Sequence, residues 1–185
     1  ATRLEKPSLG TVFFNEIDIT TLPMHRRAKL GIGYLAQEPS IFRNLSVKDN
    51  ILLVLEQTKV PRREWKKRLQ FLLHEFRLEK IADTNGSQVS GGERRRTELA
   101  SALASNLDGL KFLFLDEPFA ALDILTIKML QEIIVNLQSI EKITVVICDH
   151  QARDLLSCVD RAIVLSNGKI IASGSPNEII NDTQA

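Results

Sequence analysis

The sequence has few cysteines, few aromatic residues and no long apolar run. Its 185 residues contain only two cysteines, Cys148 and Cys158. Two are too few for a disulfide framework, which excludes a small disulfide-rich secreted scaffold and favours a reducing compartment. No apolar run reaches the roughly 18 residues that a membrane-spanning helix needs, and no signal-peptide pattern opens the chain. We therefore expect any membrane role to depend on a partner.

The charges are nearly balanced, with a formal net charge of +1. Such a balance argues against a strong field for nucleic acid or anionic lipid. Basic residues do gather on one face of a helix predicted after Pro61, but no aromatic residue interleaves them. We interpret them as a solvated helix face and expect no nucleic-acid partner. These residues are Arg62, Arg63, Lys66 and Lys67.

The sequence also lacks a Gly-x-x-x-x-Gly-Lys-Ser/Thr loop, the motif whose backbone amides cradle nucleotide phosphates. The chain opens with Ala1 rather than Met, and its pattern begins in the middle of an element. We therefore expect these residues to be a fragment of a longer protein, truncated at the N-terminus.

The apolar pattern predicts one α/β domain over residues 1–185, and 44% hydrophobic residues are ample for its core. Strands are predicted at 11–14, 32–35, 111–115 and 143–147, a polar turn at 15–21, and a hairpin at 161–173 around Asn167-Gly168. Helices are predicted at 24–30, 47–55, after Pro61, and at 90–105, 127–137 and 151–157. The strands at 111–115 and 143–147 are almost continuously apolar, which is typical of parallel strands buried on both faces. The helix-only stretch at about 45–105 is interpreted as an inserted helical lobe.

The first candidate site is the start of the helix at residue 90. Ser90 and Glu93 have capping-box spacing, so the beginning of this helix is well determined. Gly91 and Gly92 between them leave backbone N–H groups open to an anion, which the helix dipole favours. By itself this motif is also compatible with a plain capped helix behind a glycine turn.

The second candidate site is the pair Asp116-Glu117, which ends an apolar strand. A buried carboxylate pair is costly unless it serves a cation or a water. Asp116 suits Mg²⁺ and Glu117 could polarise an attacking water, although a strand end emerging into solvent is the alternative. His150 follows the strand at 143–147 and should lie at the same sheet edge as Glu117, unless it is a structural histidine.

Three further residues give weaker signals on their own. Gln37 follows a glycine-containing strand, and Asp123 reads as the N-cap of the helix at 127–137. Cys148 stands at a strand end with no base nearby in sequence, so we interpret it as a small buried filler rather than a nucleophile.

In combination, the order and spacing of these motifs resemble ABC ATPase domains. The motifs are Gln37, Val89 to Glu93, Phe112 to Glu117, Ala121 to Asp123, and His150. The resemblance implies an ABC-type P-loop NTPase fold with ATP and Mg²⁺, whose phosphate loop would precede Ala1. It implies catalytic roles for Glu117 as general base and His150 as switch histidine, and metal binding by Asp116 and Gln37. Nucleotide contacts are implied for Ser90, Gly91, Gly92, Asp123 and Gln37. Without the phosphate loop, we expect these residues alone to be inactive.

Three longer stretches are similar to the ATPases of lipopolysaccharide-export transporters. They are Leu22 to Ala28, Gly31 to Glu38 and Ser40 to Arg43. That similarity implies a homodimer at the cytoplasmic face of the inner membrane with two transmembrane partners. Their coupling helices would enter a groove near Gln37 lined by Phe42, Leu45 and Phe71. Branched-chain amino-acid transporter ATPases share some of these stretches. A pseudo-ATPase binding module without a phosphate loop and a soluble ABC protein of DNA repair or translation are further alternatives.

Overall fold

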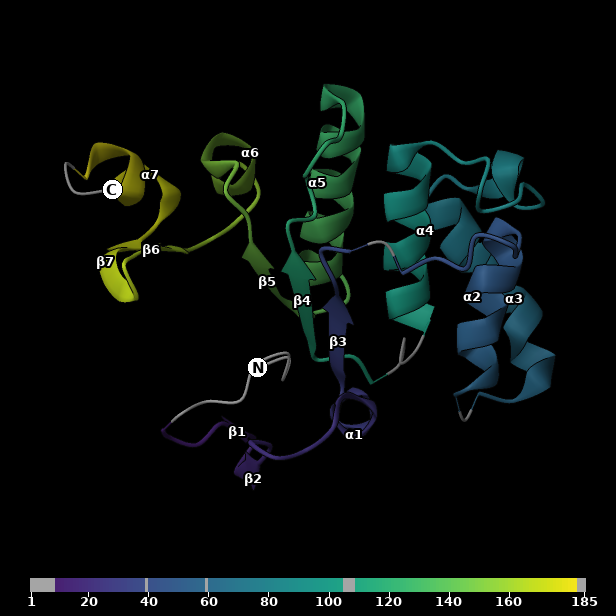
Figure 1. Ribbon diagram of the computed structural model, residues 1–185, viewed down its shortest axis with the longest axis horizontal. Helices are drawn as coiled ribbons and strands as arrows, with labels where there is room; N and C mark the ends of the chain where they lie inside the picture. The colour runs from purple at the N-terminus through teal and green to yellow at the C-terminus, as the bar shows by residue number, and fades with distance from the viewer. Residues whose placement is uncertain (1–8, 39, 59, 105–108, 183–185) are drawn as a thin grey trace.

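The computed structural model describes residues 9–38, 40–58, 60–104 and 109–182. At its centre lies a three-stranded parallel sheet with the order β3-β4-β5 (Figure 1). The strands are β3 (Ile32–Leu35), β4 (Phe112–Asp116) and β5 (Thr144–Cys148). Leu35 stands opposite Leu115, which stands opposite Ile147, so all three carboxyl ends meet at one edge. The predicted α/β fold with a parallel sheet is confirmed.

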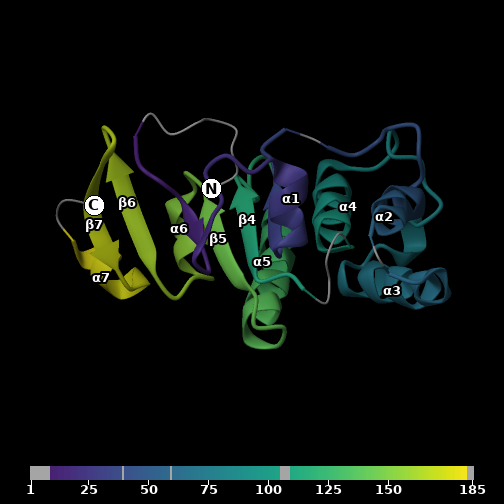
Figure 2. The same cartoon turned by 90° about the horizontal axis from the view of Figure 1, so that it is seen from below.

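One face of the sheet forms the main core. Leu113 and Leu115 of β4 are buried there, 0% and 1% exposed. Helix α5 (Ile124–Ser139) covers this face, as the view from below shows (Figure 2), and contributes Leu130 and Ile134 to the same core cluster. Burial of this apolar area is the main force that holds β4 and α5 together.

The opposite face is less buried than the sequence pattern predicts. Phe112 and Phe114 are only partly buried, and Val146 of β5 is 37% exposed. The expectation that both strands are buried on two faces is therefore wrong, because α5 and its neighbours gather on the other side. Phe14 packs edge-on against Phe112 with ring centroids 5.4 Å apart. Cys148 is exposed, so its interpretation as a buried filler is also wrong.

Between β3 and β4 the described residues form helices. They are α2 (Val47–Glu56), α3 (Arg62–Glu75), the 3-10 turn η1 (Glu79–Ile81) and α4 (Gly91–Ala104). Ser46 caps α2 by accepting a hydrogen bond from the backbone of Asp49, as the sequence predicts. Ile51 and Leu72 are fully buried where α2 and α3 meet, whereas the basic face of α3 is exposed. That this lobe is an inserted subdomain stays a prediction.

The N-terminal part departs from the prediction in one respect. The predicted polar turn at 15–21 is shorter, because β1 (Phe13–Phe14) and β2 (Ile17–Asp18) form a tight antiparallel hairpin. Asn15 and Glu16 turn the chain with φ of 46° and 66°, and paired positive φ values are typical of two-residue hairpin turns. Helix α1 (Met24–Lys29) follows, with Pro23 at its start as predicted.

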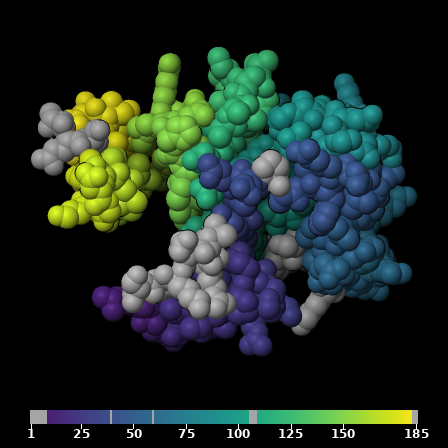
Figure 3. Space-filling view, in the orientation of Figure 1, coloured from purple at the N-terminus to yellow at the C-terminus, as the bar shows by residue number. Residues whose placement is uncertain are grey.

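The C-terminal part forms a separate hairpin at one end of the molecule, opposite the helical lobe (Figure 3). It follows α6 (Ala152–Leu156) and consists of β6 (Ala162–Ser166) and β7 (Lys169–Gly174) around the predicted Asn167-Gly168 turn. Helix α7 (Pro176–Asn181) was not predicted, although Ser175 and Glu178 form a capping box at its start. Across the described residues, no helix combines the length and apolar character that crossing a membrane requires.

Candidate functional site

The candidate site begins where β4 and β5 end. Asp116 is the last residue of β4, opposite Cys148 in the ladder. The next residue, Glu117, has a positive φ of 45°, which is uncommon for a residue other than glycine. Its backbone N–H donates to the carbonyl of Cys148 over 2.7 Å. The turn after β4 is thereby tied to β5, and the Glu117 side chain is held at the sheet edge.

Glu117 lies between Gln37 and His150. Its Oε2 accepts a hydrogen bond from Nε2 of Gln37 at 2.9 Å, and its Oε1 lies 3.6 Å from Nδ1 of His150. The Glu117 side chain is 29% exposed and that of His150 is 69% exposed. The expectation that Glu117 and His150 share one sheet edge is confirmed, and the structure adds Gln37 to them.

Asp149 supports the loop that carries His150, and sequence reasoning missed it. Its side chain is 0% exposed. It accepts hydrogen bonds from the backbone N–H groups of Phe119 at 3.2 Å and Gln151 at 2.8 Å. Gln151 also donates from Nε2 to the carbonyl of Phe119 at 3.3 Å. An acid directly before a candidate histidine at a strand end is the signal that could have found this support.

Asp116 has a neighbour from β3. The hydroxyl of Tyr34 donates to its Oδ2 at 3.2 Å. Burial, and then the negative charge of Asp116, raises the pKa of Tyr34 above its ordinary value, so the hydroxyl stays a hydrogen-bond donor at neutral pH.

The oxygens of Asp116 and Gln37 fit a magnesium ion bound together with a nucleotide. Carboxylate and amide oxygens are hard donors, and Mg²⁺ is usually held by one or two carboxylates plus water and phosphate oxygens. In the described part of the chain, no group of three or more His, Cys, Asp or Glu side chains could hold a metal by itself.

A second group of candidate residues lies at the start of α4. The Ser90 N–H donates to Oε2 of Glu93 at 2.8 Å, and the Glu93 N–H donates to Oγ of Ser90 at 3.3 Å, which completes the predicted capping box. The Ser90 backbone hydrogen bond is the main cause that lowers the pKa of the Glu93 carboxyl. Gly91 is exposed, with nothing within 4 Å of where a Cβ would stand.

The packing of α4 against α5 also explains why residue 92 is a glycine. A Cβ there would stand 2.9 Å from both Oγ1 and Cγ2 of Thr126 on α5. The same Oγ1 donates to Oδ2 of Asp123 at 2.6 Å, and Asp123 caps α5 as predicted. The Thr126 hydroxyl is the main cause that lowers the pKa of Asp123.

The structure thus sorts the predicted residues into two groups. Gln37, Asp116, Glu117 and His150 meet at the sheet edge. Ser90, Gly91, Gly92 and Asp123 gather where α4 and α5 begin. The hydrogen bonds of Ser90 stay within its own helix, to Glu93 and Arg94.

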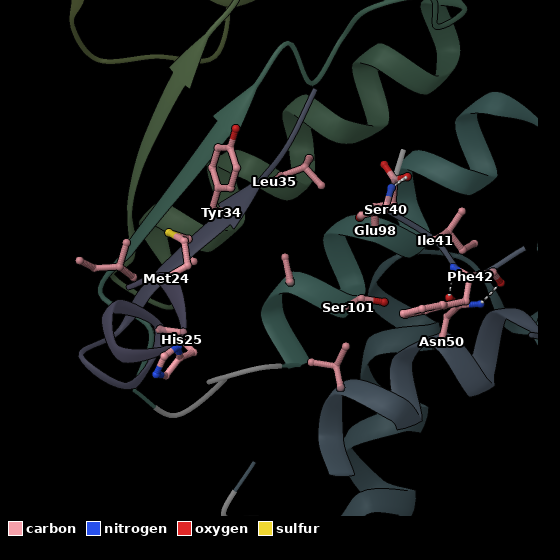
Figure 4. A pocket seen from close by; sticks show the side chains of 15 residues that line it. Met24, His25, Tyr34, Leu35, Ser40, Ile41, Phe42, Asn50, Glu98 and Ser101 are labelled. Atoms are coloured by element: carbon pink, nitrogen blue, oxygen red, sulfur yellow. Dashed lines mark hydrogen bonds between the residues drawn. The ribbon is translucent and has the colours of Figure 1, made fainter. Parts of the chain in front are cut away.

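A groove of about 410 Å³ opens on the side of β3, between α1 and the helical lobe (Figure 4). Its lining includes Met24 and Tyr34, the segment Ser40 to Phe42, and Glu98. Phe42 was expected there and is found there, 57% exposed. Leu45 and Phe71 were expected as well, but they do not line this groove. Phe71 instead lines a small cavity of about 60 Å³ between α3 and α5, because its face of α3 turns towards α5.

Comparison with known proteins decides the family. A model of the family described as "ABC transporter" matches residues 1–120. The chain belongs to the ABC transporter family. It is similar to the lipopolysaccharide export system ATP-binding protein LptB of Acidithiobacillus ferridurans, with 45% identity over 97% of this chain and 73% of that protein. For LptB of Escherichia coli K12 the identity is 43%, over 94% of this chain and 70% of that protein.

Solved structures of ABC proteins share the fold. The ATP-binding cassette MJ0796, solved as a dimer with ADP and Pi, superposes with a TM-score of 0.79 at 26% identity over 94% of this chain and 76% of that one. CbiO1 of Clostridium perfringens, part of an ABC transporter complex, superposes with a TM-score of 0.84 at 26% identity, over 98% of this chain and 72% of that one. The predicted ABC-type fold is confirmed, and the chain is an ATP-binding subunit of an ABC transporter.

Proposed function

We propose that this chain belongs to an ATPase subunit that powers lipopolysaccharide export. The sheet edge that carries Gln37, Asp116, Glu117 and His150 is its catalytic edge, and the groove on the side of β3 is its partner groove. The observation that carries the proposal is the environment of Glu117, with one oxygen held by Gln37 and the other facing His150. Similarity to LptB supports lipopolysaccharide as the exported substrate.

In this proposal Glu117 is the general base. Its Oε1 lies 3.6 Å from Nδ1 of His150, so a single attacking water bound beside the pair could contact both groups. Glu117 would take a proton from that water as it attacks the γ-phosphorus of ATP, with ADP as the leaving group. His150 would hold the water and the γ-phosphate in position. Catalysis of phosphoryl transfer depends mainly on such positioning and on electrostatic stabilisation.

Asp116 and Gln37 are the residues that would hold Mg²⁺. When bound, the ion neutralises charge on the β- and γ-phosphates. Tyr34 would fix the orientation of the Asp116 carboxylate through its 3.2 Å hydrogen bond. Gln37 connects the two roles, because its amide nitrogen is already bonded to Glu117.

The residues at the start of α4 would act on a nucleotide held by a second copy of the subunit. Ser90 and Gly91 are exposed, and the N-terminus of a helix attracts anions such as a γ-phosphate. Gly92 and Asp123 would set the position of this helix end through Thr126. The dimeric state of MJ0796 supports a homodimer.

The groove beside Gln37 is where a transmembrane partner would dock. Exposed Phe42 and the apolar lining around Met24 and Ile41 suit the apolar side of a short partner helix. The proposal therefore has the subunit at the cytoplasmic face of the inner membrane, attached through its partners.

The test is replacement of LptB in Escherichia coli by the full gene-encoded subunit. Growth and lipopolysaccharide transport should be restored by the subunit and not by its Glu117→Gln variant. A subunit that hydrolyses ATP but restores neither overturns the assignment to lipopolysaccharide export, and ATP-dependent leucine uptake would then favour the amino-acid importer. A subunit that binds a partner but never hydrolyses ATP would favour a pseudo-ATPase.

A further inference from the structure

Two charged residues on α4 are buried deep between the groove and the catalytic edge. Arg95 is 8% exposed and Glu98 is 4% exposed. Their side chains form an ion pair, with Nη1 of Arg95 3.2 Å from Oε2 of Glu98. Buried charges are costly to desolvate, so such a pair persists only where further hydrogen bonds satisfy it.

Arg95 makes these hydrogen bonds with the backbone at the ends of β3 and β4. Its Nη2 donates to the carbonyls of Asp116 at 2.6 Å and Glu117 at 3.1 Å. Its Nη1 donates to the carbonyl of Ala36 at 2.8 Å, directly before Gln37. One planar guanidinium thus holds the backbone on both sides of the Gln37–Glu117 hydrogen bond, and a single ammonium could not reproduce this fork.

Glu98 connects the same arginine to the groove. Its Oε1 accepts a hydrogen bond from the backbone N–H of Ser40 at 3.0 Å, and Glu98 itself lines the groove (Figure 4). Ser40 and the neighbouring Ile41 and Phe42 form the wall that a docked partner would touch. Two side chains therefore span the distance from that wall to the backbone of the catalytic base.

We propose that the Arg95–Glu98 pair is a positioning device that couples occupancy of the groove to the placement of Glu117. A partner that moves the Ser40 backbone pulls on Glu98, which changes the ion pair and hence the carbonyls that Arg95 holds. Neither residue touches the nucleotide in this account. The inference rests on the proposed ATPase function and names how its partner regulates it.

The experiment measures steady-state ATP hydrolysis by the full gene-encoded subunit, alone and in complex with its transmembrane partners. Replacing only one of the two residues would leave an unpaired buried charge. The central variant is therefore the double replacement Arg95→Met with Glu98→Leu, because buried ion pairs can often be replaced by apolar residues without loss of stability. We expect kcat to fall about 10- to 100-fold, as for small misplacements of catalytic groups. The KM for ATP should change less than about twofold, and stimulation by the partners should disappear.

Two further variants separate positioning from folding. Arg95→Lys keeps the charge but loses the fork, so it should also lower kcat with little change in KM. Arg27→Met is the matched control, because Arg27 is likewise buried (2% exposed) and donates to the carbonyls of Ile19, Thr20 and Leu22 away from the catalytic edge. It should lower the melting temperature but leave the kcat of the folded protein unchanged.

The outcomes distinguish this inference from the proposed function. If the wild-type subunit does not hydrolyse ATP, the proposed function fails. If it does, and either the double variant or Arg95→Lys keeps the wild-type kcat and partner stimulation, the positioning role is overturned. A loss of kcat in proportion to the unfolded fraction, matching Arg27→Met, would overturn it as well, because the pair would then serve stability alone.

Discussion

The side chain of Gln37 donates a hydrogen bond to the side chain of Glu117 over 2.9 Å, although the two residues lie 80 positions apart. Gln37 follows β3 and Glu117 follows β4, and these strands are direct neighbours in the parallel sheet. A contact that shifts the side chain of Gln37 would therefore reach the proposed catalytic base directly through this hydrogen bond. The groove lies on that same loop, from Ser40 to Phe42.

The two glycines at the start of α4 should respond differently to substitution. Gly92→Ala should destabilise the fold by about 1–3 kcal/mol, as overpacking typically does, because the new Cβ meets Thr126, whose hydroxyl is bonded to Asp123. Gly91→Ala is the matched control, since open space surrounds its Cβ position and alanine favours helices. Thermal unfolding of both variants measures the difference. Equal melting temperatures would show that Gly92 has no packing role.

Asp149 should matter for catalysis through the loop that it holds. Asp149→Ala removes the acceptors of the Phe119 and Gln151 backbone N–H groups and should free His150 from its position beside Glu117. We expect kcat for ATP hydrolysis by the full subunit to fall about 10-fold or more, in line with misplaced catalytic groups. Asp154→Ala, which removes the acid in the first turn of α6, serves as the control. An Asp149→Ala variant with wild-type kcat would show that the loop does not depend on this carboxylate.

The two thiols should differ in reactivity. Burial raises the pKa of Cys158 to about 11, so only about one thiol in a thousand is ionised at pH 8, and the thiolate is the reactive form. Cys148 is exposed, although burial of its sulfur and the charge of Asp116 raise its pKa too. Iodoacetamide should therefore label Cys148 first at pH 8, and raising the pH to 10 should speed up labelling of Cys158. Mass spectrometry of a time course measures both, and earlier labelling of Cys158 at pH 8 would contradict the burial assigned to it.

The sequence predicted the α/β class and the order of elements because strand and helix periodicities are strong in this chain. The strands at 111–115 and 143–147 were correctly predicted as parallel strands, and the structure shows that they pair with each other. The expectation that both faces of these strands are buried was wrong, because the sequence pattern shows that a strand is apolar but not which helices cover it. The short β2 strand and helix α7 were missed because their patterns span too few residues to stand out.

The candidate site was predicted in part. Spacing along the chain was enough to place Glu117 and His150 at one sheet edge, since parallel strands bring their carboxyl ends together. The supports of these residues could not be read in the same way. Arg95 and Glu98 look like ordinary charged helix residues in the sequence, and only the packing of α4 against the loops after β3 and β4 shows their buried contacts.

The 185 residues on their own should bind ATP weakly and not hydrolyse it. They contain no Gly-x-x-x-x-Gly-Lys-Ser/Thr sequence, and the backbone amides and lysine of such a loop are what hold the β- and γ-phosphates in P-loop NTPases. Isothermal titration with Mg-ATP and a phosphate-release assay test this directly. The full gene-encoded subunit is the comparison, and Mg-ATP turnover by the 185-residue chain that Glu117→Gln abolishes would contradict the expectation.

The most direct test of the account is the rate of ATP hydrolysis by the full gene-encoded subunit when Glu117 is replaced by glutamine. This change keeps the size of the side chain and an oxygen that can accept from Gln37, but it removes the base. General-base catalysis contributes about 10²- to 10⁴-fold, so we expect kcat to fall by that factor while ATP binding persists. A Glu117→Gln subunit that hydrolyses ATP at the wild-type rate would contradict the central claim.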